Sequence, residues 1–358
     1  MRLSWGTVLE VTEASEKRQR LCVRIDGRRD VDAINYLDIA PALEEGDRAL
    51  LNMTALDLGL GTGGVAFVVP TEEKQDKYEI QGQGRIMKLR YTPLQREVFA
   101  VEEQGSLHHE HMQSALSLAG LPVVCCALAS QVPLVAAAIK AEKGDARVVL
   151  CMTDEASLML AFSDLFTQAR ATGLIDTIIT CGQALGGDAE AITLHSAMLA
   201  ALHVFGADVC IVSIGPGTPG SATPFGHGGI AQGEAINAVA ALDGIAVAPL
   251  RVSFADKRER HRAVSHHSIT ALSRICLARA IIPVPKNLSE EQTAEIVEML
   301  ELAGLYERHD ITEIGYDEGK IDLRGLTVTT MGRTQAEDPA FFSAAYAAGA
   351  LAATLIDR

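Results

Sequence analysis

The stretch VCIVSIGPGTPGSATPFGHGG, residues 209–229, begins as an uninterrupted apolar run and continues as a glycine-rich loop. Its first six residues have the length and composition of a strand that is buried on both faces. An apolar pattern of helical period follows over 230–242 and is closed by Gly244. A strand, a loop and a helix in this order are typical of a parallel sheet that is covered by helices.

The same alternation recurs on both sides of this stretch. Helix signals follow the strands: Thr153 as the cap of a helix that ends before Gly173, Asp188 before a helix closed by Gly206, a capping box at 289–292, and Asp338-Pro339. We therefore predict an α/β domain over 106–358, with a mainly parallel sheet and helices on both faces. The predicted strands are 122–128, 147–152, 175–180, 208–214, 245–250 and 280–284, with further pieces near 310–315 and 326–331.

The first 105 residues have a different pattern. Short strand-like runs alternate with turn signals such as Asp26-Gly27 and Glu45-Gly46, and helical periodicity is nearly absent. This pattern predicts a small all-β domain, either a barrel or a sandwich. Two further strands around Pro93 fit either part, so the boundary falls somewhere between residues 70 and 106.

Composition and charge restrict the partners. The formal net charge of −15 repels phosphate backbones and anionic lipid, so we expect neither a nucleic acid nor a membrane as a partner. No apolar leader follows Met1, and the odd number of cysteines, seven, includes no CxxC pair. These features predict a cytoplasmic protein with reduced thiols.

The loop at 215–229 is the first candidate for a ligand site, because ligands of open parallel sheets bind beyond the carboxyl ends of the strands. Glycines let backbone amides approach an anion closely, and hydroxyl groups add donors. The loop after the 175–180 strand offers similar groups. A structural loop held by prolines is the alternative reading. The predicted ligand-binding residues are Gly215, Gly217, Thr218, Gly220, Ser221, Thr223, Gln183, Gly186 and Gly187.

A dinucleotide is not predicted as the ligand, although GPGTPG at 215–220 matches the pattern GxGxxG. Two prolines interrupt the motif and no helix opens within it. The same literal pattern at 59–64 is followed by a strand, which a dinucleotide-binding turn does not allow. The cofactor is therefore left unassigned.

Four residues are candidates for acid–base chemistry. His266 and His267 follow Ser265 at the start of a predicted helix, where the neutral imidazole is favoured. His227 ends the glycine-rich loop, and Asp154 follows a strand. A hydrogen bond to a loop is the alternative role for the histidines, and a helix-dipole contact is the alternative for Asp154. No metal site is assigned, because the histidines at 108–111 lack HExxH spacing.

Several segments together resemble one known family. They are NMTA at 52–55, LGLGTGG at 58–64, MKLRYTPLQ at 87–95, the glycine-rich loop, and SHHS at 265–268. In combination they resemble the bacterial domain of unknown function 3866 family, over essentially the whole chain. The resemblance implies a bacterial cytoplasmic protein of this length and transfers no activity or catalytic residue.

Three hypotheses for the function remain open. The first is a protein that binds a small polar or anionic metabolite at the carboxyl edge of the sheet, as an enzyme using histidine acid–base chemistry. The second is a regulatory protein that senses such a ligand without turnover. The third is a metal-dependent hydrolase using histidines near 108–111 and 266–267. A homo-oligomer is also conceivable, since Ala345, Gly349 and Ala353 give the last helix a small-residue face.

Overall fold

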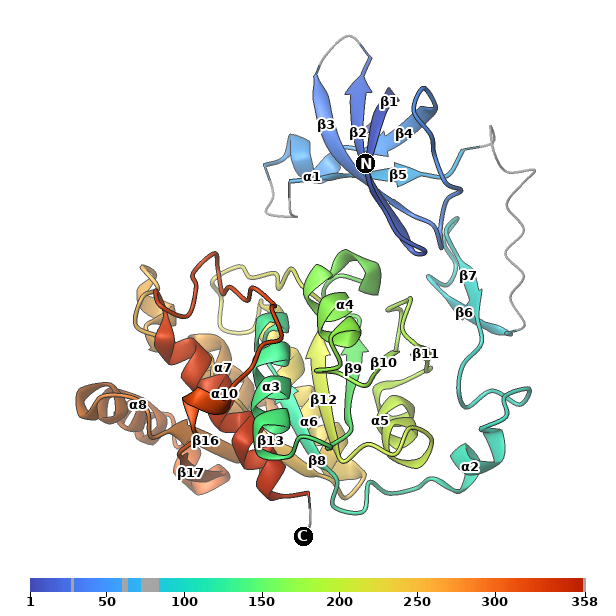
Figure 1. The fold of residues 1–358 in the computed structure, drawn as a ribbon. Helices are drawn as coiled ribbons and strands as arrows, with labels where there is room; N and C mark the ends of the chain where they lie inside the picture. Colours follow the sequence, from blue (N-terminus) through green and yellow to red (C-terminus); the bar gives the residue numbers. More distant parts are fainter. Residues whose placement is uncertain (27–28, 60–63, 72–83, 357–358) are drawn as a thin grey trace. The chain divides into compact units, whose positions relative to one another are not determined.

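The computed structural model describes residues 1–26, 29–59, 64–71 and 84–356 (Figure 1). By internal contacts the chain divides into two compact units. One is Met1–Gln83 with Leu89–Arg96, and the other is Gly84–Lys88 with Glu97–Arg358. Part of the GxGxxG-like pattern at 59–64 and most of the connector after residue 71 lie outside the described residues.

The N-terminal unit contains a closed β-barrel, which confirms the predicted all-β fold. The strands follow the order β1-β2-β3-β5-β4, with only β3 and β5 parallel among the pairs. Alternate residues such as Leu21, Val23 and Leu51 fill the interior. The elements are β1 (Leu3–Ala14), β2 (Arg18–Ile25), β3 (Asp30–Tyr36), β4 (Arg48–Asn52), α1 (Thr54–Asp57) and β5 (Ala66–Val69). Two short strands of the larger unit, β6 (Ile86–Lys88) and β7 (Arg96–Val98, whose first residue belongs to the N-terminal unit), pair around Pro93.

The larger unit is built on an eight-stranded, all-parallel sheet, which confirms the predicted α/β fold with a mainly parallel sheet. Its order is β11-β10-β9-β12-β8-β13-β16-β17. Long crossovers with helices connect parallel strands of this kind. The strands are β8 (Pro122–Cys126), β9 (Val148–Thr153), β10 (Thr177–Thr180), β11 (Ala189–Glu190), β12 (Val209–Ile214), β13 (Ile245–Val247), β16 (Ile281–Pro285) and β17 (Asp310–Ile314).

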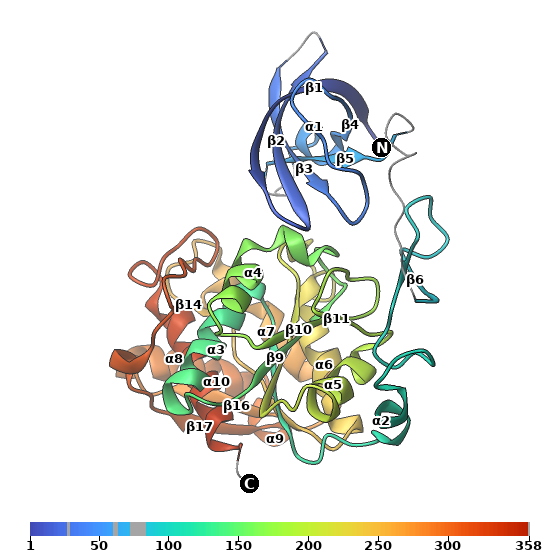
Figure 2. The same cartoon turned by 45° about the vertical axis from the view of Figure 1, so that its right-hand side comes forward.

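Helices cover both faces of this sheet (Figure 2). One apolar cluster joins the sheet to α3 (Val132–Glu142), α4 (Asp164–Ala171) and α10 (Pro339–Thr354). The other joins the opposite face to α5 (Leu194–His203), α6 (Ala231–Ala241) and α8 (Glu290–Leu302). Successive residues of one strand, such as Cys210 and Ile211 of β12, belong to different clusters because side chains alternate across a strand. The remaining short elements are α2 (His109–Ser114), β14 (Val252–Ser253), β15 (Ala263–Val264), α7 (His266–Thr270) and α9 (Leu305–Arg308).

Two helix starts lie later than predicted. The helix expected to begin after Thr153 begins at Asp164, where the Ser163 hydroxyl accepts from the Phe166 amide at 3.2 Å. Long-range backbone bonds, such as Leu160 to the Leu185 carbonyl, hold the intervening segment outside a helix. Similarly, α5 is capped by Thr193 rather than by Asp188. The Asp188 carboxylate instead accepts from the Ile178 amide at 2.8 Å.

The strand predicted near 326–331 is wrong. Leu326, Val328 and Thr330 are buried while their neighbours are exposed, which produces the alternating pattern seen in the sequence. However, this segment joins none of the described sheets, and Thr330 pairs only with Arg333 in a tight turn. Alternating burial therefore arises here from a loop that lies against the core.

The small-residue face of α10 packs within the chain, against α3. The two helices lie side by side in both views (Figures 1 and 2). A β-carbon added at Gly349 would stand 2.3 Å from the Val135 carbonyl oxygen and 2.7 Å from the Ala138 β-carbon. Glycine at this position therefore permits the close approach of the two backbones.

We expect Gly349→Ala to lower the free energy of unfolding by about 1–3 kcal/mol, the usual cost of overpacking. The two backbones must separate to admit the methyl group, because a carbonyl oxygen cannot move aside as a flexible side chain can. Urea unfolding measures the effect. Gly315→Ala is the control, since the nearest atom to the added β-carbon would be Cδ of Lys286, at 3.8 Å. Equal stability of the two variants would contradict the packing described.

Candidate functional site

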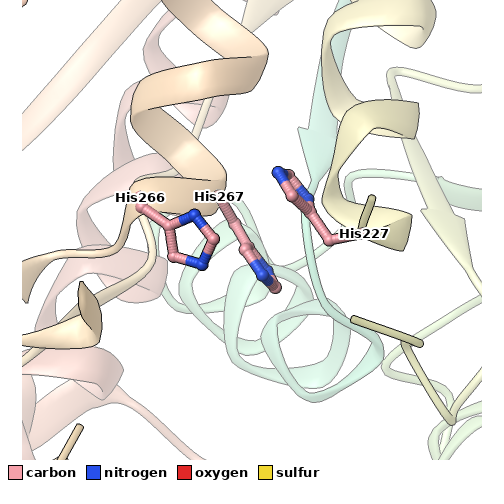
Figure 3. Close-up of side chains that lie close together, drawn as sticks. All are labelled: His227, His266 and His267. Carbon is pink, nitrogen blue, oxygen red and sulfur yellow. The ribbon is translucent and has the colours of Figure 1, made fainter. Parts of the chain in front are cut away.

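Two loops at the carboxyl edge of the sheet bring the predicted histidines together (Figure 3). His227 ends the glycine-rich loop that follows β12, whereas His266 and His267 begin α7, which follows β13 by way of the β14–β15 hairpin. Strands β12 and β13 flank the same strand, β8. Segments far apart in the sequence therefore converge because parallel strands end at a common edge.

Hydrogen bonds fix α7 against the end of β13. The Ser265 amide donates to the Arg251 carbonyl at 2.9 Å, and the Arg251 amide donates to the Ser268 hydroxyl at 2.9 Å. The Ser265 hydroxyl caps α7 by accepting from the His267 amide at 3.2 Å. These hydrogen bonds therefore hold His266, His267 and Arg251 close together at the end of β13.

Four imidazole rings make up this cluster, with His261 added to the three predicted histidines. The rings of His227 and His267 stack with centroids 3.8 Å apart and planes at 6°. The His266 centroid lies 4.5 Å from that of His267 and 5.3 Å from that of His227. The His261 ring lies 5.0 Å from His266 and 4.9 Å from His267. We call these four residues the histidine cluster.

Hydrogen bonds assign the tautomers of two rings. The His227 Nε2 group lies 3.0 Å from the Pro224 carbonyl, which only accepts, so the proton of the neutral ring is on Nε2. His267 Nδ1 lies 3.3 Å from Nη1 of Arg251, which only donates, so its proton is also on Nε2. Two buried ring nitrogens, His227 Nδ1 and His266 Nε2, have no hydrogen-bond partner among the described residues.

Burial keeps the cluster neutral. Desolvation is the main cause that lowers the pKa of all four rings, and Arg251 lowers it further in each; neighbouring rings add to the effect for His261, His266 and His267. The pKa of His261 falls to about 3 and that of His267 to about 2. A neutral imidazole can accept a proton at one ring nitrogen and donate a hydrogen bond from the other, and a rise in its pKa on ligand binding would make it a stronger base.

Arg251 is a buried cation with little compensation. The residue is 5% exposed, and within the described part of the chain its guanidinium makes a single hydrogen bond, to His267 Nδ1 at 3.3 Å. The nearest carboxylate oxygen, on Asp256, lies 3.9 Å away. That carboxylate is already engaged by Arg258, whose nitrogens lie 2.7 and 2.9 Å from its oxygens, and Arg333 lies 3.6 Å from it. Burial lowers the pKa of Arg251 to about 10, so it remains charged near neutrality.

The glycine-rich loop uses most of its hydroxyl groups internally. Ser221 and Thr223 are 2.9 Å apart through their hydroxyls and both bond to Gly226. Gly220 and Gly229 lie beside the cluster, since a β-carbon would lie 3.8 Å from His267 Nε2 at Gly220 and 3.1 Å from His227 Nδ1 at Gly229. Gly215, by contrast, packs against Ser157 and Met152. Gly217 and Thr218 lie between these two positions, and Gly217 has a positive φ of 95°.

The other predicted ligand residues form a separate group at the end of β10. Asp154 accepts from the Gln183 amide at 2.6 Å, and a β-carbon on Gly182 would meet its carboxylate. The Gly186 amide donates to Glu190 and the Gly187 amide to the Thr180 hydroxyl. Each of these hydrogen bonds stabilises the loop itself. The structure thus joins Asp154 to the 182–187 loop and not to the histidines.

A metal ion is the other group that the histidines could hold. One ring nitrogen from each of His227, His266 and His267 lies within 4.8 Å of the others. In the parallel stack of His227 and His267, however, the in-plane lone pairs do not converge, so one ring must turn before both could bind one ion. His109, in the group that the metal hypothesis named first, directs Nδ1 to the Glu102 carbonyl at 2.8 Å.

Sequence reasoning did not assign three members of this site: His261, Arg251 and Asp256. The signal for Arg251 was its position directly after the predicted 245–250 strand, because ligands of parallel sheets bind beyond the carboxyl ends of the strands. His261 and Asp256 lie in the charged segment 254–262, whose composition resembles an exposed loop. The signal that could have indicated these two residues was a histidine within a segment of mixed acidic and basic residues.

Comparison with known proteins identifies the family but no activity. A family model described as "Protein of unknown function (DUF3866)" matches residues 32–349. No curated protein and no solved structure matches the chain. Within the described residues, no helix is both long enough and apolar enough to cross a membrane.

Proposed function

The chain belongs to the DUF3866 family, and we propose that in this member the histidine cluster and Arg251 form a site that binds a small anionic metabolite and transfers protons to and from it. One observation carries the proposal: a buried guanidinium whose carboxylate neighbour, Asp256 at 3.9 Å, is shared with Arg258 and Arg333, next to four imidazoles. A buried charge is costly unless it is well paired, and an anionic ligand would give Arg251 a closer partner.

The ring tautomers support distinct roles for two histidines. The Nε2–H group of His267 can donate a hydrogen bond to an oxygen of the ligand, while Arg251 holds the opposite side of the same ring. The free lone pair on His227 Nδ1 can accept a proton, because its Nε2–H group is held by the Pro224 carbonyl. An anion bound at Arg251 would raise the pKa of these rings and make them better bases.

Thermal unfolding with a panel of anions tests the proposal. Phosphate, pyrophosphate, citrate and sulfate are compared at pH 7.5 and equal ionic strength. A ligand at 100 times its Kd stabilises the folded state by about 2.7 kcal/mol, so we expect at least one anion to raise the Tm by several degrees and to saturate. A shift that rises linearly with salt for all anions alike would contradict a specific site.

A divalent cation is the second candidate, because two buried ring nitrogens have no partner among the described residues. The surrounding guanidinium groups of Arg251, Arg258 and Arg333, with Asp256 between them, disfavour a further cation. Metal analysis of protein purified without chelators separates the two. Stoichiometric zinc that is lost in His227→Gln and His266→Gln would favour the metal site.

Turnover distinguishes an enzyme from a regulatory protein. If an anion binds and is chemically converted, its conversion should depend on His227, the proposed base. A ligand that binds tightly and is recovered unchanged would favour the sensing role.

A further inference from the structure

A groove of about 760 Å³ opens beside the histidine cluster. Its walls come from three segments: the end of the glycine-rich loop, the turn that continues α7, and the α8–α9 connection. The volume lies within the range of about 300–1,000 Å³ that is usual for small-molecule sites. The lining residues are Pro224, Phe225, Ile269, Thr270, Ser273, Arg274, Leu302, Ala303, Gly304, Glu307 and Arg308.

Two direct connections link the groove to the cluster. Pro224 lines the groove, and its carbonyl accepts from His227 Nε2 at 3.0 Å. Ile269 and Thr270 also line it, and they lie three and four residues after His266 on the same helix. Residues at this spacing share one helix face, so His266 lies on the same side of α7 as these two lining residues.

The groove presents large apolar side chains that the fold does not need to bury. Phe225 is 61% exposed and Leu302 is 82% exposed, although both line a concave surface. Aromatic and aliphatic side chains at such a surface gain free energy when an apolar group covers them. Both side chains therefore offer apolar surface that a ligand in the groove could cover.

The charges in the groove suit an anion. Arg274 and Arg308 line it together with one acid, Glu307. Arg308 donates to the Cys276 carbonyl at 2.9 Å, whereas Arg274 makes no hydrogen bond or ion pair with the described residues. The two arginines against one acid give the groove an excess of positive charge, which would attract an anionic molecule.

We infer that the ligand is an amphipathic anion: a phosphate or carboxylate group bound at Arg251, attached to an aromatic or aliphatic group that lies in the groove against Phe225 and Leu302. This inference rests on the proposed function, because it assigns a second part to the same ligand. The inference restricts the ligand from small anions in general to phosphate esters or carboxylic acids that carry an aromatic or aliphatic group.

Calorimetric titration with a matched series of probes tests the inference. Inorganic phosphate is compared with phenyl phosphate, 2-phenylethyl phosphate and 4-phenylbutyl phosphate, which place the ring at increasing distances from the anion. We expect the best ester to bind at least about tenfold more tightly than phosphate, because it buries a phenyl ring. Its binding should also show the more negative heat-capacity change that apolar burial produces.

Variants assign the gain to the groove. Phe225→Ser and Leu302→Ser should each weaken the ester by about fivefold or more and leave phosphate affinity unchanged. Leu277→Ser is the control, since Leu277 is 85% exposed and does not line the groove. Equal affinities for phosphate and all three esters would overturn the inference and leave the proposed function intact. If neither phosphate nor any ester binds, both the inference and the proposed function are wrong. If an ester binds equally well to Arg251→Met, the groove binds the apolar group but Arg251 does not bind the anion, and the inference is wrong in that part.

Discussion

Arg251→Met is expected to abolish the stabilisation by phosphate while it leaves the free energy of unfolding within about 1 kcal/mol of the wild type. The two expectations differ because the acid nearest to Arg251, Asp256 at 3.9 Å, is shared with Arg258 and Arg333. Removal of the side chain relieves a poorly compensated buried charge, and methionine fills a similar volume. A residue that mainly served stability would show the opposite result, a large loss of stability in the absence of any ligand.

The local contacts explain why the fold tolerates this change. Asp256 keeps Arg258, whose nitrogens lie 2.7 and 2.9 Å from its oxygens, so no acid loses its main partner. The His267 ring loses one hydrogen bond of 3.3 Å, a modest cost. The backbone groups of Arg251, which hold α7, remain unchanged by a side-chain substitution.

Binding, in contrast, should weaken at least about 30-fold, because truncating one member of a buried charge pair costs about 2 kcal/mol or more. Calorimetric titration with phosphate and urea unfolding without phosphate measure the two effects separately. Arg251→Lys should bind with intermediate affinity, since lysine keeps the charge but not the two-pronged geometry. Arg170→Met, at an exposed ion pair with Asp188, is the control. Phosphate affinity that survives in Arg251→Met would place the anion elsewhere.

The fold could be predicted from the sequence because the buried strands of a parallel sheet are continuous apolar runs in the sequence. The stretch 209–214 lies within β12 at the centre of the sheet, and its neighbours were found by the same pattern. The predictions failed where long-range contacts decide local structure. Thr153 has the chemistry of a helix cap, yet the segment after it bonds to the 185 and 216 regions instead.

The site was only partly accessible for a related reason. Both histidine-containing segments follow predicted strands, so the rule for parallel sheets placed them at one edge. Whether two loops at that edge touch depends on strand order, which the sequence pattern does not contain. The order explains why His227 meets His267 whereas Asp154 and Gln183 form their own group at the end of β10. Burial of the charged segment around Asp256 and His261 depends on tertiary packing and has no periodic signal.

Stability is expected to fall steeply as the pH decreases below about 6.5, the pKa of histidine in the unfolded chain. In the folded state, burial holds the pKa of the four clustered rings below that value, and also the pKa of His309. Between these limits the unfolded chain binds protons that the folded chain excludes. The stabilisation is therefore fully present above about pH 6.5 and is lost as the pH falls, by at most about 1.4 kcal/mol per pH unit for each ring.

The variant His267→Gln tests how much of the loss of stability at low pH comes from the histidine cluster rather than from other titrating groups. The pKa of His267 is lowered to about 2, so between pH 6 and 5 this variant should lose close to one ring's share of the slope, measured by urea unfolding. His195→Gln, at an exposed position on α5, should keep the wild-type slope. Asp256 does not affect the slope between pH 6 and 5. Its pKa is lowered in the folded state, so its contribution to stability is lost only below about pH 4. A slope that is equal in wild type and His267→Gln would contradict a neutral, buried ring.

The bound anion should flatten this pH dependence, and that coupling connects the two predictions. An anion at Arg251 stabilises the protonated rings and raises their folded-state pKa toward the unfolded value. Sulfate is the suitable probe, since its charge is constant over this range. By linkage, its affinity should increase as the pH falls from 7.5 to 5.5, because binding takes up protons. The increase should be lost in Arg251→Met and reduced in His267→Gln. A pH-independent sulfate affinity would show that the anion and the histidines do not share one site.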